Sequence, residues 1–497
     1  MTGSPHLPDK VLVANRGEIA VRIITTLQRL GIGSVAVYHA VDAGSRAVEL
    51  ADEAVELPGN PPVSAYLNVE AIIDACHRSG AKAIHPGFGF LSERASFAEA
   101  VRDAGLIFVG PGTDAIRAMG DKIESKVLAA RAGVPTVPGS TGAVDSVDAA
   151  IAVGEEIGYP LLLKASAGGG GKGMRVVNTA DECREAFERA TSEARSAFGD
   201  GRLLIERYIG RPRHIEVQVL GDHHGNVIHL GERECSIQRR FQKVIEEAPS
   251  PAVDDDLRAE IGARAVALAQ AVGYYSAGTV EMILDENRNA YFLEMNTRLQ
   301  VEHPVTEAVT GIDIVEEQLK IAVGESLSIA QADVKIRGSA IECRIYAEDA
   351  DAGFLPATGR LHVVRFPSGD GVRVDHGVTE GHDITSAFDP MIAKVITHAP
   401  TRREAINRMH AVLNETVLLG TTTNREYLAR VVATTAFGDG QLHTGFLDEH
   451  ADELVRPNPT RSQENFVLAV GALHSSRFDR RHQLLEPHAG MAGWTSA

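Results

Sequence analysis

The stretch LLLKASAGGGGKGMRVVN, residues 161–178, sets a run of glycines between two apolar segments that are typical of strands. The run consists of Gly168, Gly169, Gly170 and Gly171. Such a loop lets backbone N–H groups approach phosphate oxygens without interference from Cβ atoms. A dinucleotide-binding loop would join a strand to a helix, and a P-loop would have Ser or Thr in place of Gly173. The stretch therefore predicts a glycine flap over a phosphate ligand, with a flexible loop that binds nothing as the alternative.

The segments on either side of this stretch predict two kinds of sheet. Residues 11–110 alternate short apolar runs with amphipathic stretches, with strands expected at 11–15, 34–40, 81–85 and 106–110. Strands that alternate with helices predict a doubly wound parallel sheet. Residues 133–142, rich in Gly and Pro, are expected to be a linker. From Arg213 onward, alternating runs such as HIEVQVL predict antiparallel β structure with interspersed helices, so the fold class is α/β plus α+β in several domains.

Composition narrows the class of protein. The formal charge of −18 disfavours nucleic-acid binding, because a polyanion would be repelled. Four separated cysteines without a CxxC pair favour neither a disulfide framework nor a zinc site. They are Cys76, Cys183, Cys235 and Cys343. The sequence has no signal-peptide pattern at its start and no run of about eighteen apolar residues, so we expect a cytoplasmic protein without a membrane span.

Polar residues interrupt two apolar segments, residues 278–284 and 291–303. Glu294 and Asn296 are two apart, so on a strand they point to the same face, and Glu281 is expected to join them from the preceding strand. Carboxylate and amide oxygens are suitable ligands for Mg²⁺. Arg298, Gln300 and Glu302 are expected to extend the same period-two row. The alternative is a solvent-facing row of a half-exposed sheet.

Three lysines each lie beside one of these motifs: Lys122, Lys164 and Lys243. A lysine that ends a strand beside a glycine flap is placed to meet phosphates. For any single lysine, a solvated surface charge is the ordinary interpretation. Three of them beside motifs in an acidic protein favour a binding role.

Taken together, these segments resemble the biotin carboxylase module of biotin-dependent carboxylases. The resemblance runs from about residue 10 to 455 and is most specific in ERECSIQRRFQKVIEEAPS (232–250) and FLEMNTRLQVEHPVTE (292–307). It implies an ATP-grasp enzyme with a Rossmann-like domain at 1–120 and an ATP-grasp domain at 121–335. It also implies a lid at about 137–210, a C-terminal domain at 336–455 and a tail at 456–497.

The resemblance also implies a role for each matching residue. Lys122, Lys164 and His214 would contact the ATP phosphates or ribose, beneath the glycine flap. Glu206, Arg207 and Ile209 would hold the adenine. Glu281 and Glu294, with Asn296 nearby, would hold Mg²⁺ or Mn²⁺. Bicarbonate would be bound by Lys243, Arg298, Gln300 and Val301. Glu302 resembles the general base, and Arg344 the arginine that stabilises the biotin enolate.

The implied reaction is the ATP- and bicarbonate-dependent carboxylation of biotin through carboxyphosphate, a ligase reaction that forms a C–N bond. It would be the first half-reaction of an acyl-CoA (acetyl-CoA) carboxylase in fatty acid metabolism, with the final acceptor of the carboxyl group left open by the sequence. No AMKM-like tetrapeptide occurs, so we expect biotin to arrive on a separate biotin carboxyl carrier protein that works with a carboxyltransferase subunit, or on a part of the protein outside this sequence. A homodimer is also implied.

Two residues depart from the family pattern, and two alternative functions are compared with biotin carboxylation. Phe241 and Phe388 stand where the family often has His and Tyr, which puts nucleotide affinity in doubt but not activity. One alternative is another ATP-grasp carboxylase or ligase. The other is a catalytically silent scaffold subunit, which would be expected to lack some of the six residues Glu281, Glu294, Lys243, Arg298, Glu302 and Arg344. All six are present.

Overall fold

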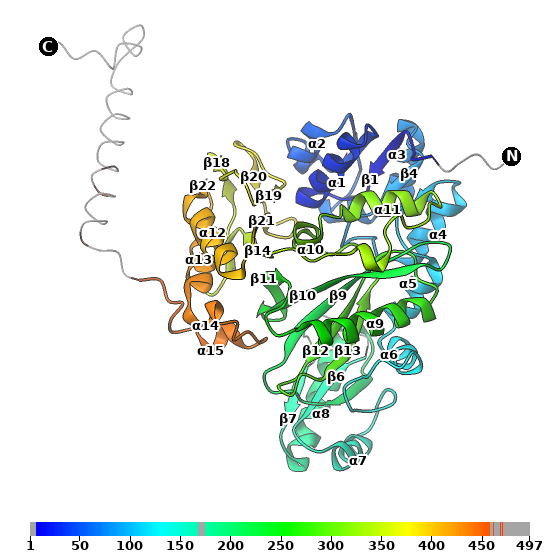
Figure 1. Cartoon of the computed structure of the whole chain (residues 1–497), viewed down its shortest axis with the longest axis vertical. Helices are drawn as coiled ribbons and strands as arrows, with labels where there is room; N and C mark the ends of the chain where they lie inside the picture. The colour runs from blue at the N-terminus through cyan, green and yellow to red at the C-terminus, as the bar shows by residue number, and fades with distance from the viewer. Residues whose placement is uncertain (1–5, 167–173, 458–460, 462–467, 469, 471–497) are drawn as a thin grey trace, which may run out of the picture. The chain divides into compact units, whose positions relative to one another are not determined.

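The computed structural model describes residues 6–166 and 174–457, together with 461, 468 and 470. The chain divides into two units, Met1–Leu454 and Val455–Ala497. The fold described below is that of the first unit (Figure 1). The predicted glycine flap at 168–171 and most of the tail lie outside the described residues. Within the described part of the chain, the helices are too short or too polar to cross a membrane.

The N-terminal part is a five-stranded parallel sheet in the order β3-β2-β1-β4-β5. The strands are β1 (Lys10–Val13), β2 (Gly33–Tyr38), β3 (Glu53–Glu56), β4 (Ala83–His85) and β5 (Ile107–Phe108). The helices between and after them are α1 (Gly17–Arg29), η1 (Ala40–Asp42), α2 (Arg46–Leu50), η2 (Pro62–Leu67), α3 (Val69–Ser79), α4 (Ala95–Asp103) and α5 (Thr113–Gly120). The central strand β1 carries a continuous buried VLV run, as strands covered on both faces do. The predicted doubly wound parallel sheet is confirmed.

A small antiparallel sheet, β7-β6-β8, follows the linker. It consists of β6 (Leu161–Ala165), β7 (Arg175–Val177) and β8 (Leu203–Arg207), with α6 (Lys122–Arg131) before the linker and α7 (Val147–Ile157) and α8 (Ala180–Phe198) beside the strands. The linker is not free: Thr136 bridges Phe292, and Gly139 bridges Glu206. A Cβ atom on Gly139 would lie 2.2 Å from the Ile205 carbonyl oxygen, so only glycine allows this close approach.

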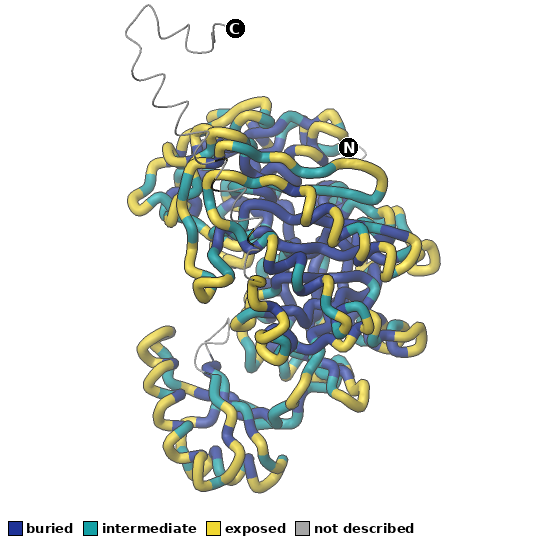
Figure 2. The backbone as a smooth tube through the Cα atoms, turned by 90° about the vertical axis from the view of Figure 1, so that its left-hand side faces the viewer, coloured by how far each residue is buried: buried dark blue, intermediate teal, exposed yellow. Residues whose placement is uncertain are grey.

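The largest element is an eight-stranded sheet in the order β13-β12-β9-β10-β11-β14-β21-β19. Its strands are β9 (Arg213–Gly221), β10 (Val227–Arg239), β11 (Gln242–Ala248), β12 (Ser276–Leu284), β13 (Ala290–Asn296), β14 (Ser339–Tyr346), β19 (Val372–His376) and β21 (Met391–Ala399). All seven pairings between its neighbouring strands are antiparallel, as predicted from Arg213 onward. Figure 2 shows most of its backbone as buried.

Helices and short strands complete the unit around this sheet. They are α9 (Asp255–Ala271), α10 (His303–Thr310), α11 (Ile314–Ala322), η3 (Gln331–Asp333), β15 (Glu348–Asp349), β16 (Leu355–Pro356), β17 (Gly359–Arg360), β18 (Val363–Arg365), β20 (Asp383–Ile384), α12 (Arg402–Glu415), β22 (Val417–Leu419), α13 (Arg425–Ala433), α14 (Thr435–Gly438) and α15 (Phe446–Glu449). Helix α12 starts at a capping box in which the Thr401 side chain accepts from Glu404 N–H and the Glu404 side chain accepts from Thr401 N–H. Its apolar face joins a core with β14 and β21.

One prediction about the strands is wrong. The period-two row does not continue through Arg298, Gln300 and Glu302, because β13 ends at Asn296. Strand β13 lies at the edge of the sheet, and helix α10 begins soon afterwards at His303, with Pro304 in its first turn. Proline has no N–H to donate to a ladder and favours the first turn of a helix. Residues 297–302 are therefore an irregular connection.

Candidate active site

A row of charged side chains crosses one face of the eight-stranded sheet. Glu294 on β13 lies opposite Glu281 on β12, and Glu281 lies opposite Glu216 on β9. Glu216 in turn lies opposite Arg233 on β10, which is fully buried. Buried charges destabilise a fold unless they are paired, so a buried row of charged side chains is typical of a functional site.

Lys243 on β11 lies at the centre of the row. Its Nζ lies 2.8 Å from Glu281 Oε1 and 2.7 Å from Glu302 Oε1, and it also contacts Glu216. Burial lowers the pKa of Lys243, but the three carboxylates together raise it well above its usual value. Lys243 is therefore a fixed positive charge shared by three acids.

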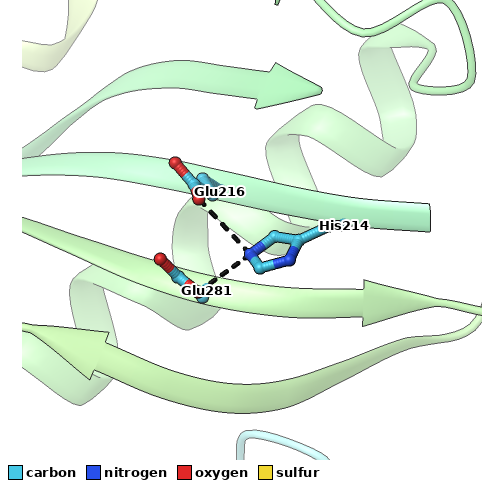
Figure 3. Close-up of side chains that lie close together, drawn as sticks. All are labelled: His214, Glu216 and Glu281. Carbon is cyan, nitrogen blue, oxygen red and sulfur yellow. Dashed lines mark ion pairs between the residues drawn. The ribbon is translucent and has the colours of Figure 1, made fainter. Parts of the chain in front are cut away.

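Glu281 is the most heavily bonded of these acids. Its Oε1 accepts hydrogen bonds from Asn296 Nδ2 at 2.6 Å and from Gln300 Nε2 at 2.7 Å, besides the contact with Lys243. His214 Nε2 lies 2.8 Å from Glu281 Oε2 and 3.3 Å from Glu216 Oε1 (Figure 3). Burial lowers the pKa of His214, but these two carboxylates raise it to about 9. His214 is therefore a second cation in the row at neutral pH.

Glu302 is buried at the N-terminal end of α10, where the helix dipole favours a negative charge. Its Oε1 meets Lys243, and its Oε2 lies 3.0 Å from Arg344 Nη2 on β14. Burial raises the pKa of Glu302, but Lys243 and Arg344 outweigh it, and the pKa is lowered overall. Glu302 is thus a water-poor carboxylate that is ionised at neutral pH, with a cation on each oxygen.

The irregular connection after β13 is held from several directions. Arg298 Nε donates to Glu93 Oε2 at 2.9 Å, and Arg298 Nη2 donates to Asn296 Oδ1 at 3.0 Å. The carbonyl oxygen of Val301 accepts a hydrogen bond from Lys394 Nζ at 2.7 Å. Asn296 in turn donates to Glu281, which Gln300 and Lys243 also contact. The predicted bicarbonate residues Lys243, Arg298 and Gln300, with the adjacent Val301, are therefore brought together around Glu281, although the predicted strand is absent.

The predicted metal residues fit a hard divalent cation. Glu281 and Glu294 face each other across β12 and β13, and desolvation together with repulsion from Glu281 raises the pKa of Glu294. A carboxylate in that position lacks positive charge, which Mg²⁺ bound by carboxylate oxygens would supply. The His214, Glu216 and Glu281 ligand atoms also lie within 4.8 Å of one another, but Glu216 is already paired with Lys243 and Arg233.

A second charged group lies at the small sheet. Lys164 on β6 and Lys126 on α6 both contact the carboxylate of Glu206 on β8. Burial raises the pKa of Glu206, but the two lysines lower it to about 2. Lys122 is the first residue of α6, and Ile209 follows β8. Arg207 Nη2 donates to Tyr291 Oη at 3.3 Å, which ties β8 to β13.

Five charged residues of the two groups escaped the sequence-based prediction: Glu93, Lys126, Glu216, Arg233 and Glu246. Two of them carried a local signal. Glu216 is two residues after His214 on a strand, so it shares the face of His214. Lys126 is four residues after Lys122 on a helix, so it shares the face of Lys122. The others are brought in only by long-range pairing.

Comparisons with known proteins agree with this arrangement. Residues 8–116 match the family "Biotin carboxylase, N-terminal domain", residues 121–330 match "Carbamoyl-phosphate synthase L chain, ATP binding domain", and residues 342–449 match "Biotin carboxylase C-terminal domain". The propionyl-CoA carboxylase alpha chain of Sus scrofa is 52% identical over 93% of this chain, which spans 64% of that relative's length. The 2-oxoglutarate carboxylase small subunit of Hydrogenobacter thermophilus is 48% identical over 94% of this chain and 98% of its own length.

A solved structure extends this likeness to three dimensions. The biotin carboxylase domain dimer of the Hydrogenobacter thermophilus 2-oxoglutarate carboxylase, in complex with MgADP, ADP and bicarbonate, has a TM-score of 0.87 and 48% identity. The similarity covers 91% of this chain and 100% of that one. The likeness in three dimensions therefore extends over most of this chain.

Proposed function

Because this chain belongs to the biotin carboxylase family of ATP-grasp enzymes, we propose that it couples ATP cleavage to the carboxylation of biotin with bicarbonate. The observation that carries the proposal is Glu302, an ionised buried carboxylate held between Lys243 and Arg344. A base fixed among cations suits a substrate that must lose a proton to become a nucleophile.

In the first step, Glu302 takes the proton of bicarbonate while a bicarbonate oxygen attacks the γ-phosphorus of ATP. The bond from that phosphorus to the β–γ bridging oxygen breaks, so ADP leaves and carboxyphosphate forms. Lys243 and Arg298, which both lie near Glu281, would hold the bicarbonate anion, with Gln300 and Val301 beside them. Their fixed contacts orient the anion before reaction, which saves entropy at the barrier.

The nucleotide would lie between the row and the small sheet. Lys122, Lys164 and His214 would bind its phosphates or ribose, and Glu206, Arg207 and Ile209 its adenine. Glu281 and Glu294 would hold Mg²⁺, with Asn296 beside them, and the ion would neutralise charge on the phosphates. The opposing carboxylates Glu281 and Glu294 support this assignment.

In the second step, carboxyphosphate breaks into CO₂ and phosphate, and the phosphate takes the ureido N–H proton of biotin. The biotin nitrogen then attacks CO₂ to give carboxybiotin. The enolate form of the deprotonated ureido group needs a cation, and Arg344, which lies 3.0 Å from Glu302, is in position to provide one. Arg344 thus contacts the base of the first step and would stabilise the enolate of the second step.

For the whole protein, we propose the first half-reaction of an acyl-CoA carboxylase, with biotin on a carrier protein and a carboxyltransferase subunit as partners. The Sus scrofa relative is a propionyl-CoA carboxylase chain, and the Hydrogenobacter thermophilus relative is a subunit of a 2-oxoglutarate carboxylase. These relatives favour neither acetyl-CoA as the acceptor nor a role in fatty acid metabolism. The homodimer draws support from the dimeric relative of known structure. The cytoplasmic location stays a prediction, since the Sus scrofa relative is mitochondrial.

The test is ADP release by the purified chain with Mg-ATP and bicarbonate, with and without free biotin. We expect bicarbonate-dependent turnover that biotin stimulates, and a fall of about 10²–10⁴-fold in Glu302→Gln. The exposed Glu286→Gln, on the turn between β12 and β13, is the matched control and should stay at the wild-type rate. Turnover without bicarbonate, or full activity in Glu302→Gln, would refute the proposal in favour of another ATP-grasp ligase.

A further inference from the structure

Glu206 has two lysine counter-ions where one would balance its charge. Its carboxylate is only 3% exposed, and its two oxygens contact Lys126 Nζ and Lys164 Nζ separately. Both lysines are themselves largely buried. A buried carboxylate needs one nearby cation, so the second lysine is an excess positive charge in a water-poor site.

The two lysines reach Glu206 from different parts of the fold. Lys164 and Glu206 belong to the same small sheet, in which Leu162 is the register partner of Glu206. Lys164 is two residues further along β6, so it projects from the same face. Lys126 comes from α6, outside that sheet, one helical turn after Lys122. Its contact with Glu206 does not depend on Lys164.

The lysines destabilise one another. Burial lowers the pKa of Lys126, Glu206 raises it, and Lys164 and Lys122 lower it again, with a net decrease. Two lysines on one carboxylate leave a surplus of positive charge, and Lys122, whose charge also lowers the pKa of Glu294, adds to it. The repulsion between clustered lysines is relieved when a ligand of opposite charge binds. A chain of phosphates is such a ligand.

We propose that Lys126 is a positioning residue that keeps Glu206 neutralised while Lys164 leaves it to bind the nucleotide phosphates. This rests on the proposed function, in which Lys164 binds phosphate. Without Lys126, Lys164 would be the sole counter-ion of a buried carboxylate, and its move to phosphate would leave that carboxylate uncompensated. Lys126 therefore lowers the cost of nucleotide binding and does not take part in the chemical steps.

The first test is nucleotide affinity in Lys126→Met, measured by titration calorimetry with Mg-ADP and by the KM for ATP. We expect both constants to rise by about tenfold to a hundredfold, with kcat at saturating ATP within about twofold of wild type. Lys126→Arg, which keeps the charge, should restore wild-type affinity to within about threefold. Arg131→Met removes a charge from an exposed position at the end of the same helix and should change neither constant.

The decisive test is a double-mutant cycle with Glu206→Gln. If Lys126 acts only by compensating Glu206, Lys126→Met should change the affinity of the Glu206→Gln protein by less than about twofold. The same loss in both backgrounds would overturn the inference, because Lys126 would then contact the nucleotide itself. Unchanged affinity in Lys126→Met alone would also overturn it. If that variant fails to fold, Lys126→Gln replaces it in the cycle.

The outcomes separate this inference from the proposed function. Wild-type protein that binds no nucleotide would refute the proposed function. Wild-type protein that binds Mg-ADP but lacks bicarbonate-dependent ADP release would refute biotin carboxylation and leave the role of Lys126 to be decided by the cycle.

Discussion

The charged row and the Glu206 group are both buried, but their charges are balanced in opposite directions. Along the row, the cations Lys243, His214, Arg233 and Arg344 compensate Glu216, Glu281 and Glu302, but Glu294 on the edge strand is short of positive charge. At the small sheet, lysines outnumber the single carboxylate. The difference shows that a buried site with a surplus of one charge is suited to a ligand of the opposite charge. The row is prepared for a metal cation and the Glu206 group for phosphates.

The largest expected effect is that of Lys243→Met, which removes the central cation of the charged row. Lys243 compensates Glu216, Glu281 and Glu302 at once, so its loss leaves the base and its neighbours repelling one another. We expect kcat for biotin-stimulated ADP release to fall by at least about 10³-fold. The affinity for Mg-ADP should change by less than about threefold, the reverse of the pattern expected for Lys126→Met.

The exposed Lys335→Met serves as the control for this experiment and should be fully active. If Lys243→Met lost nucleotide affinity as strongly as kcat, the two charged groups would not act separately. The comparison would then fail.

Glu246 allows a sharper test at the end of the row, because it shares Arg344 with Glu302. Its Oε1 lies 2.5 Å from Arg344 Nη2, and burial raises the pKa of Glu246 to about 7 although Arg344 lowers it. Below that pH, Glu246 is neutral and resembles glutamine. Above it, the carboxylate holds Arg344 by an ion pair.

We therefore expect the rate of Glu246→Gln to match wild type near about pH 6 and to fall about tenfold below it near about pH 8.5. The measurement is the pH profile of kcat with free biotin. A ratio that is constant across this range would show that Glu246 positions Arg344 by shape and not by charge.

The smallest effect concerns Glu18, a buried acid on helix α1 that lies beside Lys394 of β21. Lys394 Nζ lies 3.2 Å from Glu18 Oε2, yet burial raises the pKa of Glu18 to about 7. A pKa raised in the folded state contributes stability that is complete below the unfolded value, about 4.5, and is lost as pH rises through 7. Glu18→Gln should remove this loss, so its melting temperature relative to wild type should rise by a few degrees from acidic to basic buffer. Parallel melting curves at every pH would contradict it.

The sequence predicted most of the local structure because periodicity is a local property. The parallel sheet follows from the alternation of strand and helix patterns. The antiparallel strands follow from segments such as HIEVQVL, in which polar and apolar residues alternate. The residues implied by the family resemblance include Lys243, Glu281, Glu302 and Arg344, which the fold brings within contact of one another.

The rest depended on contacts between distant segments. Glu93 reaches Arg298 across more than 200 residues, and Lys126 reaches Glu206 across 80. Neither pairing leaves a trace in spacing. The end of β13 was missed because its polar alternation continues into residues 298–302, although the chain leaves the sheet after Asn296 and enters helix α10 at His303.

The continuity of the eight-stranded sheet has a consequence for how the chain can be divided. The similarity to the ATP-binding family ends at residue 330, and the similarity to the C-terminal family begins at 342. Yet β11 pairs with β14 from Ile245 to Ala248, so the sheet runs across that border. A fragment that stopped near residue 335 would leave the backbone groups along β11 without partners, and such bare edges recruit strands from other molecules. We therefore expect a fragment cut at this border to aggregate through its exposed edge, and it would also lack Arg344 on β14.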